Sequence, residues 1–274
     1  MLELGPPTSE ELGPPGEQGG GGSPGIPSLS GPFDPFLGRF ARMATEVGGR
    51  VLVARDAGRA VALLLTDPED RTASLFTRSP DAARALWAET SGWATFAEVA
   101  LPLPREEFIV YAARLDAAPQ HRFRHRVRLL DPGDTEAVAE LLHEVYGGAH
   151  LRWLGIARGA GEVGFVTEVE GRLVGVAWVL VVGGHARLHG LTVRPGFRRL
   201  GLGTDLLSAR LLFAAREGAR QVVSEIAVGN APSRAIAERA GMRDAGRIYL
   251  YLPSPPAVGP PGPELRLVPG STSA

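Results

Sequence analysis

The stretch TVRPGFRRLGLGTDLL, residues 192–207, links an apolar segment to a predicted helix and holds three glycines and three arginines. Closely spaced glycines let consecutive backbone N–H groups converge, because no Cβ atoms obstruct them. At a helix N-terminus, these N–H groups and the helix dipole favour an anion. The stretch therefore predicts a phosphate-binding turn between a strand and a helix.

Three phosphate-binding designs can be compared with this turn. A P-loop requires a lysine, and the chain has no lysine. The dinucleotide fingerprint G-x-G-x-x-G fails at its third glycine, where Leu206 stands, and the surrounding sequence predicts hairpins rather than parallel crossovers. The remaining pattern is R-x-x-G-x-G, residues 198–203. The alternative is a tight strand-to-helix turn that carries its arginines by chance.

Length and composition limit the partners of the chain. Its 274 residues are 44% hydrophobic, which is enough for two domains. The net charge of -1 disfavours a nucleic-acid partner, so the basic run HRFRHRVR (121–128) is interpreted as a solvated strand or interdomain linker. No apolar run has the length of a membrane span, and the acidic N-terminus does not resemble a secretory signal. We expect a cytoplasmic protein, monomeric or homodimeric, that binds no membrane.

Two residue types bear on the chemistry. The absence of cysteine excludes disulfides, thiolate metal sites and cysteine nucleophiles. The six histidines show no metal-ligand spacing with carboxylates, so no metal is expected.

The chain reads as two related halves between Pro/Gly-rich ends. Residues 1–34 and 253–274 hold too few large apolar groups to offset the entropy of ordering, which predicts disordered tails. Residues 50–89 predict strand, turn, strand, turn, strand and helix, and residues 164–217 repeat that order. The glycine loop occurs in the second copy alone. We therefore expect a degenerate unit at 35–120 and a ligand-binding unit at 121–252.

The second half has clear helix and strand signals. It predicts a strand at 126–130, a helix that starts at Asp134 or Thr135 and ends near Gly147, and a helix at 204–217. A strand at 221–228, a helix at 231–240 with Asn230 as its N-cap, and a strand at 247–252 follow. The order β–α–β–β–β–α–β–α–β indicates a mixed α+β fold.

At this point the sequence resembles a known family. LHGLTVRPGFRRLGLGTDLL (188–207) and SEIAVGNAPSRAIAERAGM (224–242) are similar to the GNAT superfamily of acyl-CoA-dependent N-acyltransferases, and the resemblance covers about 126–252. It implies a splayed, mostly antiparallel sheet flanked by helices, here as two tandem GNAT-like units. It also implies acetyl-CoA as the acyl donor, with its pyrophosphate on the loop amides. The donor-binding residues carried over by motif are Leu191, Thr192, Val193, Arg198, Arg199, Leu200, Gly201, Leu202, Gly203, Thr204 and Asn230.

Two residues are candidates for the general base. Glu225 lies in an apolar strand, where a carboxylate is costly to bury unless it is paired or functional. Some family members carry a base glutamate five residues before the matching asparagine, as Glu225 precedes Asn230. The alternative role is an ion pair with Arg220 or Arg247. His189 shares a strand face with Leu191 and is either a base acting through water or a packed histidine.

The proton donor departs from the family pattern. Many relatives have a tyrosine seven residues after the asparagine, and this chain has Ala237 there. Tyr249 or Tyr251 is a candidate substitute, although such a pair on one strand face often only packs. The acceptor site is expected in 147–164, with Arg152 and Trp153 as its candidate substrate residues.

Together with these residues, the resemblance implies an N-acetyltransferase that transfers an acetyl group from acetyl-CoA to a primary amine by direct attack. The acceptor is either a small molecule or a protein amine. Because Ala237 lacks a hydroxyl, a non-catalytic acyl-CoA-binding or regulatory module is the first alternative. An interaction protein that uses its Pro-rich ends is the second.

Overall fold

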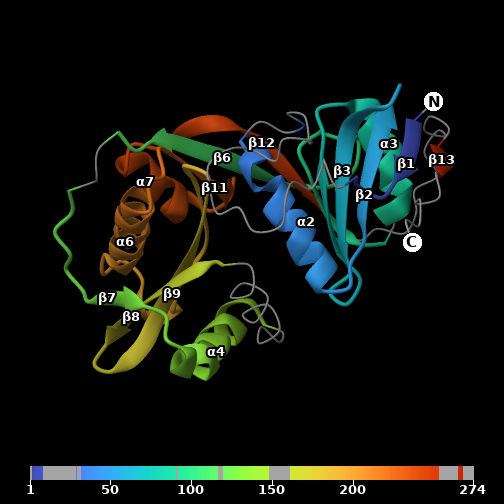
Figure 1. Ribbon diagram of the computed structural model, residues 1–274. Helices are drawn as coiled ribbons and strands as arrows, with labels where there is room; N and C mark the ends of the chain where they lie inside the picture. Colours follow the sequence, from blue (N-terminus) through green and yellow to red (C-terminus); the bar gives the residue numbers. More distant parts are fainter. Residues whose placement is uncertain are drawn as a thin grey trace. The chain divides into compact units, whose positions relative to one another are not determined.

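The computed structural model describes residues 2–8, 29, 32–90, 92–116, 120–147, 161–252 and 265–267. It divides into two compact units, which are labelled by element in Figure 1. The first unit comprises Met1–Ile109 and Gly246–Ala274, and the second comprises Val110–Ala245. The chain passes from one unit to the other within β6 (Glu106–Arg114) and returns within β12 (Arg243–Tyr251).

The first unit is a sheet with helices on both faces. Its strands follow the order β13-β1-β2-β3-β4-β5-β12, with antiparallel neighbours except for the parallel pairs β1/β13 and β4/β5. Its remaining elements are β1 (Leu2–Gly5), η1 (Asp34–Phe36), α2 (Leu37–Glu46), β2 (Val51–Asp56), β3 (Arg59–Asp67), β4 (Thr72–Phe76), α3 (Pro80–Trp87), η2 (Ala88–Thr90), β5 (Ala94–Ala97) and β13 (Leu265–Leu267).

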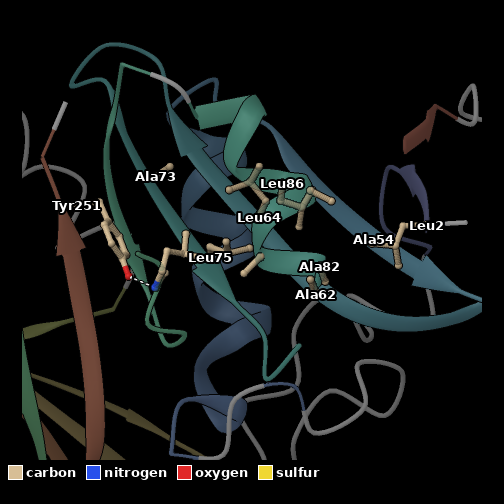
Figure 2. Packing of buried hydrophobic residues seen from close by; sticks show 13 residues of the cluster. Leu2, Ala54, Ala62, Leu64, Ala73, Leu75, Ala82, Leu86 and Tyr251 are labelled. Carbon is tan, nitrogen blue, oxygen red and sulfur yellow. Dashed lines mark hydrogen bonds between the residues drawn. The ribbon is translucent and has the colours of Figure 1, made fainter. Parts of the chain in front are cut away.

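The two-sided core of this unit follows from the alternation of side chains along β3. Leu64 lies in the cluster that includes Leu86 of α3, and Figure 2 shows the two side chains close together. Leu63 and Leu65 belong to a second cluster, with Leu37 of α2. Because both faces of β3 are covered, its sequence RAVALLLTD reads as a nearly continuous apolar run.

Tyr251 has a structural role in the first unit. Its hydroxyl accepts a hydrogen bond from the Leu101 N–H at 2.6 Å, drawn in Figure 2, and donates one to the Val99 carbonyl at 3.0 Å. Burial raises the pKa of this phenol. Its ring packs edge-on against Trp87. Tyr251 therefore fixes β12 to the loop after β5 by packing and by one buried and one partly buried hydrogen bond.

A Tyr251→Phe variant is expected to lower the free energy of unfolding by about 1–3 kcal/mol, because the buried Leu101 N–H and the partly buried Val99 carbonyl lose their partner. Urea denaturation of the full chain measures the loss. Tyr249→Phe is the matched control, since that half-buried ring lies under Arg105 with 4.9 Å between the guanidinium carbon and the ring centroid. Equal losses in the two variants would contradict the assigned role.

The second unit has the mixed sheet order β6-β11-β10-β9-β8-β7. The pair β10/β11 is parallel, and β10/β9, β9/β8 and β8/β7 are antiparallel. Its remaining elements are β7 (Val127–Leu129), η3 (Pro132–Asp134), α4 (Thr135–Tyr146), β8 (Val163–Val169), β9 (Arg172–Val182), β10 (His185–Val193), η4 (Pro195–Phe197), α6 (Leu202–Arg216), β11 (Gln221–Ala227) and α7 (Ala231–Arg239). The predicted β–α–β–β–β–α–β–α–β order is confirmed.

Two helices cover opposite faces of this sheet. Val138 and Leu141 of α4 pack with Val166 and Trp178 on one face. On the other face, Phe165 of β8 meets Phe213 of α6 with 5.6 Å between ring centroids. The sheet therefore positions the N-terminus of α6 and the C-terminus of α4 at the ends of its central strands.

The two halves repeat the same arrangement of elements. In each, a helix precedes three antiparallel strands, and the strand after the next helix runs parallel to the third of them. The last strand of each half, however, completes the sheet of the other unit. Residues 110–114 of β6 lie beside β11, and Tyr249–Tyr251 of β12 pair with Thr95–Ala97 of β5. The units are therefore not consecutive blocks of sequence.

The chain ends include two short strands. β1 and β13 lie within the segments expected to be disordered and pair in parallel, Leu2 opposite Leu265. Among the described residues, no helix is long and apolar enough to cross a membrane.

Candidate functional site

The central feature of the second unit is the point where β10 and β11 separate. The two strands are paired only at 185–187 and 221–223, although β10 continues to Val193 and β11 to Ala227. Beyond this point the Ser224 hydroxyl still donates a hydrogen bond to the Leu188 carbonyl at 2.8 Å. The splayed sheet expected from the sequence is therefore present, and it opens at Leu188.

A β-bulge lies where the splay begins. His189 is opposite Trp178 and Thr192 is opposite Val176, so two residues of β10 oppose one residue of β9. The first of the two is Gly190, with φ +60°. A Cβ at Gly190 would lie 2.8 Å from Cε3 of Trp178, so both its backbone angle and its neighbour require glycine.

The side chain of Arg210, on α6, forms hydrogen bonds with the backbone next to the bulge. Its Nη1 donates to the carbonyls of Trp178 at 3.2 Å and His189 at 3.1 Å. The side chain is 2% exposed, and burial lowers the pKa of its guanidinium. Arg210 thereby satisfies carbonyls next to the interruption of the β10/β9 ladder.

The glycine loop leads directly into α6. Gly201 is the N-cap residue with φ +94°, in the left-handed region, and its carbonyl accepts from the N–H groups of Thr204 and Asp205. Among the described residues, none accepts a hydrogen bond from the backbone N–H groups of Leu200 to Gly203. Open N–H groups at a helix N-terminus are the arrangement that an anion site requires, so the loop is the candidate site for the predicted phosphate.

The other predicted donor-binding residues lie around this loop. Thr192 is buried, and Arg198 donates through Nε to the Val193 carbonyl at 3.2 Å. Arg199 has φ +69°, and Leu200 is exposed. The side chains of Leu191 of β10 and Ile236 of α7 approach Gly203. Asn230 caps α7, with Oδ1 accepting from the Ser233 N–H at 3.2 Å.

Charged side chains gather on the strands that separate. Glu225 pairs with Arg187 at 2.7 Å, not with Arg220 or Arg247. His189 Nε2 lies 2.9 Å from Oε2 of Glu162, and its ring stacks on Trp178. Burial by itself lowers the pKa of Arg187, but the carboxylates of Glu225 and Glu162 raise it above its ordinary value. Both candidate bases are thus members of one partly buried network.

Tyr146, at the end of α4, is a residue that the sequence analysis missed. Its hydroxyl lies 3.0 Å from Oγ1 of Thr192, on the strand that follows the bulge. Arg194 bonds to Glu144 and donates to the Leu173 carbonyl, which holds this end of α4 against the sheet. Tyr249 belongs to the first unit, where it pairs with Ala97.

Two further points of the sequence analysis concern the acceptor site and metal binding. Arg152 and Trp153, the candidate acceptor residues, lie outside the described residues. No group of three or more His, Asp or Glu side chains in the described ranges is arranged to hold a metal ion.

Comparisons with known proteins agree with this geometry. The model of the acetyltransferase (GNAT) family matches residues 112–242. A mycothiol acetyltransferase of Clavibacter michiganensis subsp. michiganensis is 40% identical over 84 residues, which are 31% of this chain and 28% of that protein. The chain therefore matches less than a third of the length of this relative.

Solved structures share the fold. A tandem GNAT protein from the clavulanic acid biosynthesis pathway, 20% identical, aligns over 94% of this chain and 100% of its own with a TM-score of 0.58. A GCN5-related N-acetyltransferase from Sphaerobacter thermophilus, 17% identical, aligns over 73% of this chain and 79% of its own with a TM-score of 0.56. The first likeness extends over both units. The chain has a two-unit GNAT fold, and residues 112–242 belong to the GNAT acetyltransferase family.

Proposed function

We propose that the second unit binds acetyl-CoA and transfers its acetyl group to a primary amine. The observation that carries this proposal is the separation of β10 from β11 beside the open N-terminus of α6. The N–H groups of Leu200 to Gly203 would hold the pyrophosphate. The unpaired edge of Leu191 to Val193 would hydrogen-bond the pantetheine arm, as the family resemblance implies.

The bulge has a role in the acyl-transfer step of this proposal. A backbone N–H group next to the bulge polarises the thioester carbonyl and stabilises the negative charge that forms on its oxygen. Gly190 and Arg210 keep this backbone in place before the substrates arrive. The amine nitrogen forms a bond to the carbonyl carbon, and the carbon–sulfur bond then breaks.

His189 is the proposed base. Nε2 of His189 lies 2.9 Å from Oε2 of Glu162, but these two atoms do not have hydrogen-bond geometry. Packing of the ring against Trp178 therefore orients the imidazole before the amine arrives. Glu225 is instead engaged by Arg187 through a 2.7 Å contact. In this assignment His189 takes the proton from the amine, and Glu225 holds the charge of Arg187.

Tyr146 is the proposed proton donor to the leaving thiolate. The side chain at 237 is a buried alanine, whereas the Tyr146 hydroxyl lies beside Thr192 on the proposed donor-binding strand. A Tyr146→Phe variant is expected to lower kcat about tenfold or more, because the thiolate must then take its proton from water. Steady-state acetylation rates measure this, and acetyl-CoA affinity should stay unchanged.

The matched control for Tyr146 is Tyr249→Phe. Both changes remove one phenolic hydroxyl, but Tyr249 lies in the first unit. An undiminished rate in Tyr146→Phe, with a loss in Tyr249→Phe, would transfer the donor role to Tyr249.

The activity itself is tested by thiol release from acetyl-CoA over a panel of primary amines, which should include the acceptor of mycothiol acetyltransferases. Amine-dependent thiol release supports the enzyme. Acetyl-CoA binding without turnover of any amine would favour the non-catalytic acyl-CoA-binding module, to which the alanine at position 237 points.

A further inference from the structure

The basic run before β7 is attached to the first turn of α6 by a buried carboxylate. Asp205 is 1% exposed. Its Oδ1 lies 2.7 Å from Nε2 of His121, and its Oδ2 lies 2.8 Å from Nδ1 of His125. Oδ2 also accepts the backbone N–H of His125 at 3.0 Å, and Oδ1 that of Arg124 at 3.4 Å. We name these three side chains, Asp205, His121 and His125, the Asp205 clamp.

The Asp205 carboxylate of the clamp is buried and surrounded by hydrogen-bond donors. Burial by itself raises the pKa of Asp205, but the hydrogen bonds from His121, His125 and the backbone hold it below its ordinary value. Because a buried carboxylate with so many donors is costly to displace, the segment 121–125 has a fixed position across the N-terminus of α6. Residues 122–124 are exposed and 127–128 lie in β7, so the interpretation as a solvated strand or linker holds in part, and the clamp adds a fixed attachment to α6.

The clamp places the side chain of Arg124 against the glycine loop. A Cβ built at Gly201 would lie 3.6 Å from Cδ of Arg124 and 3.9 Å from its Nη1. Among the described residues, no carboxylate forms an ion pair with Arg124. A guanidinium that has no carboxylate partner among the described residues therefore lies beside the loop whose N–H groups, Leu200 to Gly203, are open to an anion.

We propose that Arg124 binds a phosphate group of the acyl-CoA donor and that the Asp205 clamp positions it for this contact. The inference rests on the proposed function and extends it to a segment outside the R-x-x-G-x-G motif. Arg198 already donates through Nε to the Val193 carbonyl, so Arg124 adds a cation from a second direction. Both the pyrophosphate and the 3′-phosphate of coenzyme A offer the required chemistry.

Calorimetry with the full chain distinguishes these two phosphates. We expect Arg124→Gln to weaken coenzyme A binding about tenfold, the size of a charge-assisted hydrogen bond. An equal loss with 3′-dephospho-coenzyme A assigns the contact to the pyrophosphate. A loss confined to coenzyme A assigns it to the 3′-phosphate. Wild-type affinity in Arg124→Gln would overturn the proposal.

The control is Arg122→Gln, which removes the same charge from the same run. We expect its affinity to lie within about twofold of wild type, because the exposed Arg122 side chain is not among the nearest neighbours of Gly201 and salt weakens the action of its charge at longer range. A loss as large as that of Arg124→Gln would reduce the effect to general electrostatics and overturn the proposal. Failure of the wild-type chain to bind coenzyme A at all would instead remove the proposed function.

The positioning role of the clamp has its own test. In an Asp205→Asn background, Arg124→Gln should have little further effect on coenzyme A affinity, because the guanidinium is no longer held beside the loop. The milder His121→Gln background serves if Asp205→Asn does not fold. Affinity for acetyl-pantetheine, which has no phosphate, should be unchanged in these variants. Full additivity of the two losses in both backgrounds would contradict positioning by the clamp.

Discussion

A Gly201→Val variant is expected to lose acetyl-CoA affinity by about 100-fold or more while the chain remains folded. Gly201 has φ +94°, which a β-branched residue adopts only with strain. The backbone would rotate to relieve that strain, and the N–H groups of Leu200 to Gly203 would no longer converge. Hydrogen bonds to a charged phosphate are worth more than neutral ones, so losing two of them has a large effect. Isothermal calorimetry measures the change.

Gly196→Val is the matched control for this substitution. Gly196 lies in η4, its φ is not in the left-handed region, and no atom lies within 4 Å of a Cβ built there. The control should therefore bind acetyl-CoA within about threefold of wild type, since it adds the same side chain without distorting the amides. Equal losses in the two variants, or none in either, would contradict the assignment of the loop.

The second large effect is expected at the base. A His189→Gln variant should lower kcat by about 100-fold or more, because general base catalysis contributes on that order. Acetyl-CoA affinity should be unaffected, since the imidazole lies on β10 ahead of the loop. Single-turnover acetylation of an amine found in the panel separates this loss from substrate binding.

Two variants locate the base. His185→Gln removes a histidine from the same strand, where Nδ1 lies 3.0 Å from the Gly183 carbonyl, and should retain wild-type turnover. Glu225→Gln weakens the ion pair with Arg187 and should reduce kcat less than His189→Gln does. A larger loss in Glu225→Gln, with His189→Gln nearly unimpaired, would assign the base to Glu225.

Local patterns in the sequence were sufficient to predict most elements of the second unit. The Gly201 turn, the Asn230 cap and the end of α4 at Gly147 are each determined by residues within a few positions of one another. The expected alternation along β10 is wrong at the bulge: His189 stacks on Trp178, whereas the Leu191 side chain approaches Gly203 of α6. The helix α2 has a comparable local signal. Asp34 and Pro35 precede it, and Leu37, Ala41 and Ala44 are buried at helical spacing.

The pairing of charged side chains could not be predicted in the same way. Glu225 and Arg187 are 38 residues apart, and they meet because their strands are parallel neighbours before the splay. Asp205 and His121 are 84 residues apart and depend on the path of the chain before β7. Such partners follow from tertiary packing, which no spacing within one element reports.

The exchange of final strands is also non-local. The first half ends in β6 and the second half ends in β12. A local apolar pattern can predict such a strand, but it does not predict which sheet the strand joins. For β12, the register of Tyr251 opposite Thr95 and the hydrogen bond from the Leu101 N–H to its hydroxyl provide that specification in three dimensions.

The two units differ at the equivalent junction between strand and helix. In the first unit, Thr77 and Ser79 lie between β4 and α3, and each side chain hydroxyl accepts a backbone N–H of the turn itself, from Ser79 and Ala82 respectively. Side chains of this turn therefore accept two N–H groups at the start of α3, whereas the N–H groups of Leu200 to Gly203 before α6 have no such acceptor among the described residues. This difference predicts a single acetyl-CoA site, in the second unit, although the chain contains the fold twice.

The most direct test is a calorimetric titration of the full-length wild-type chain with acetyl-CoA. The account predicts one site per chain, with a dissociation constant on the order of micromolar. Absence of binding at that level would contradict the assignment of the loop, and two equivalent sites would contradict the distinction between the two units.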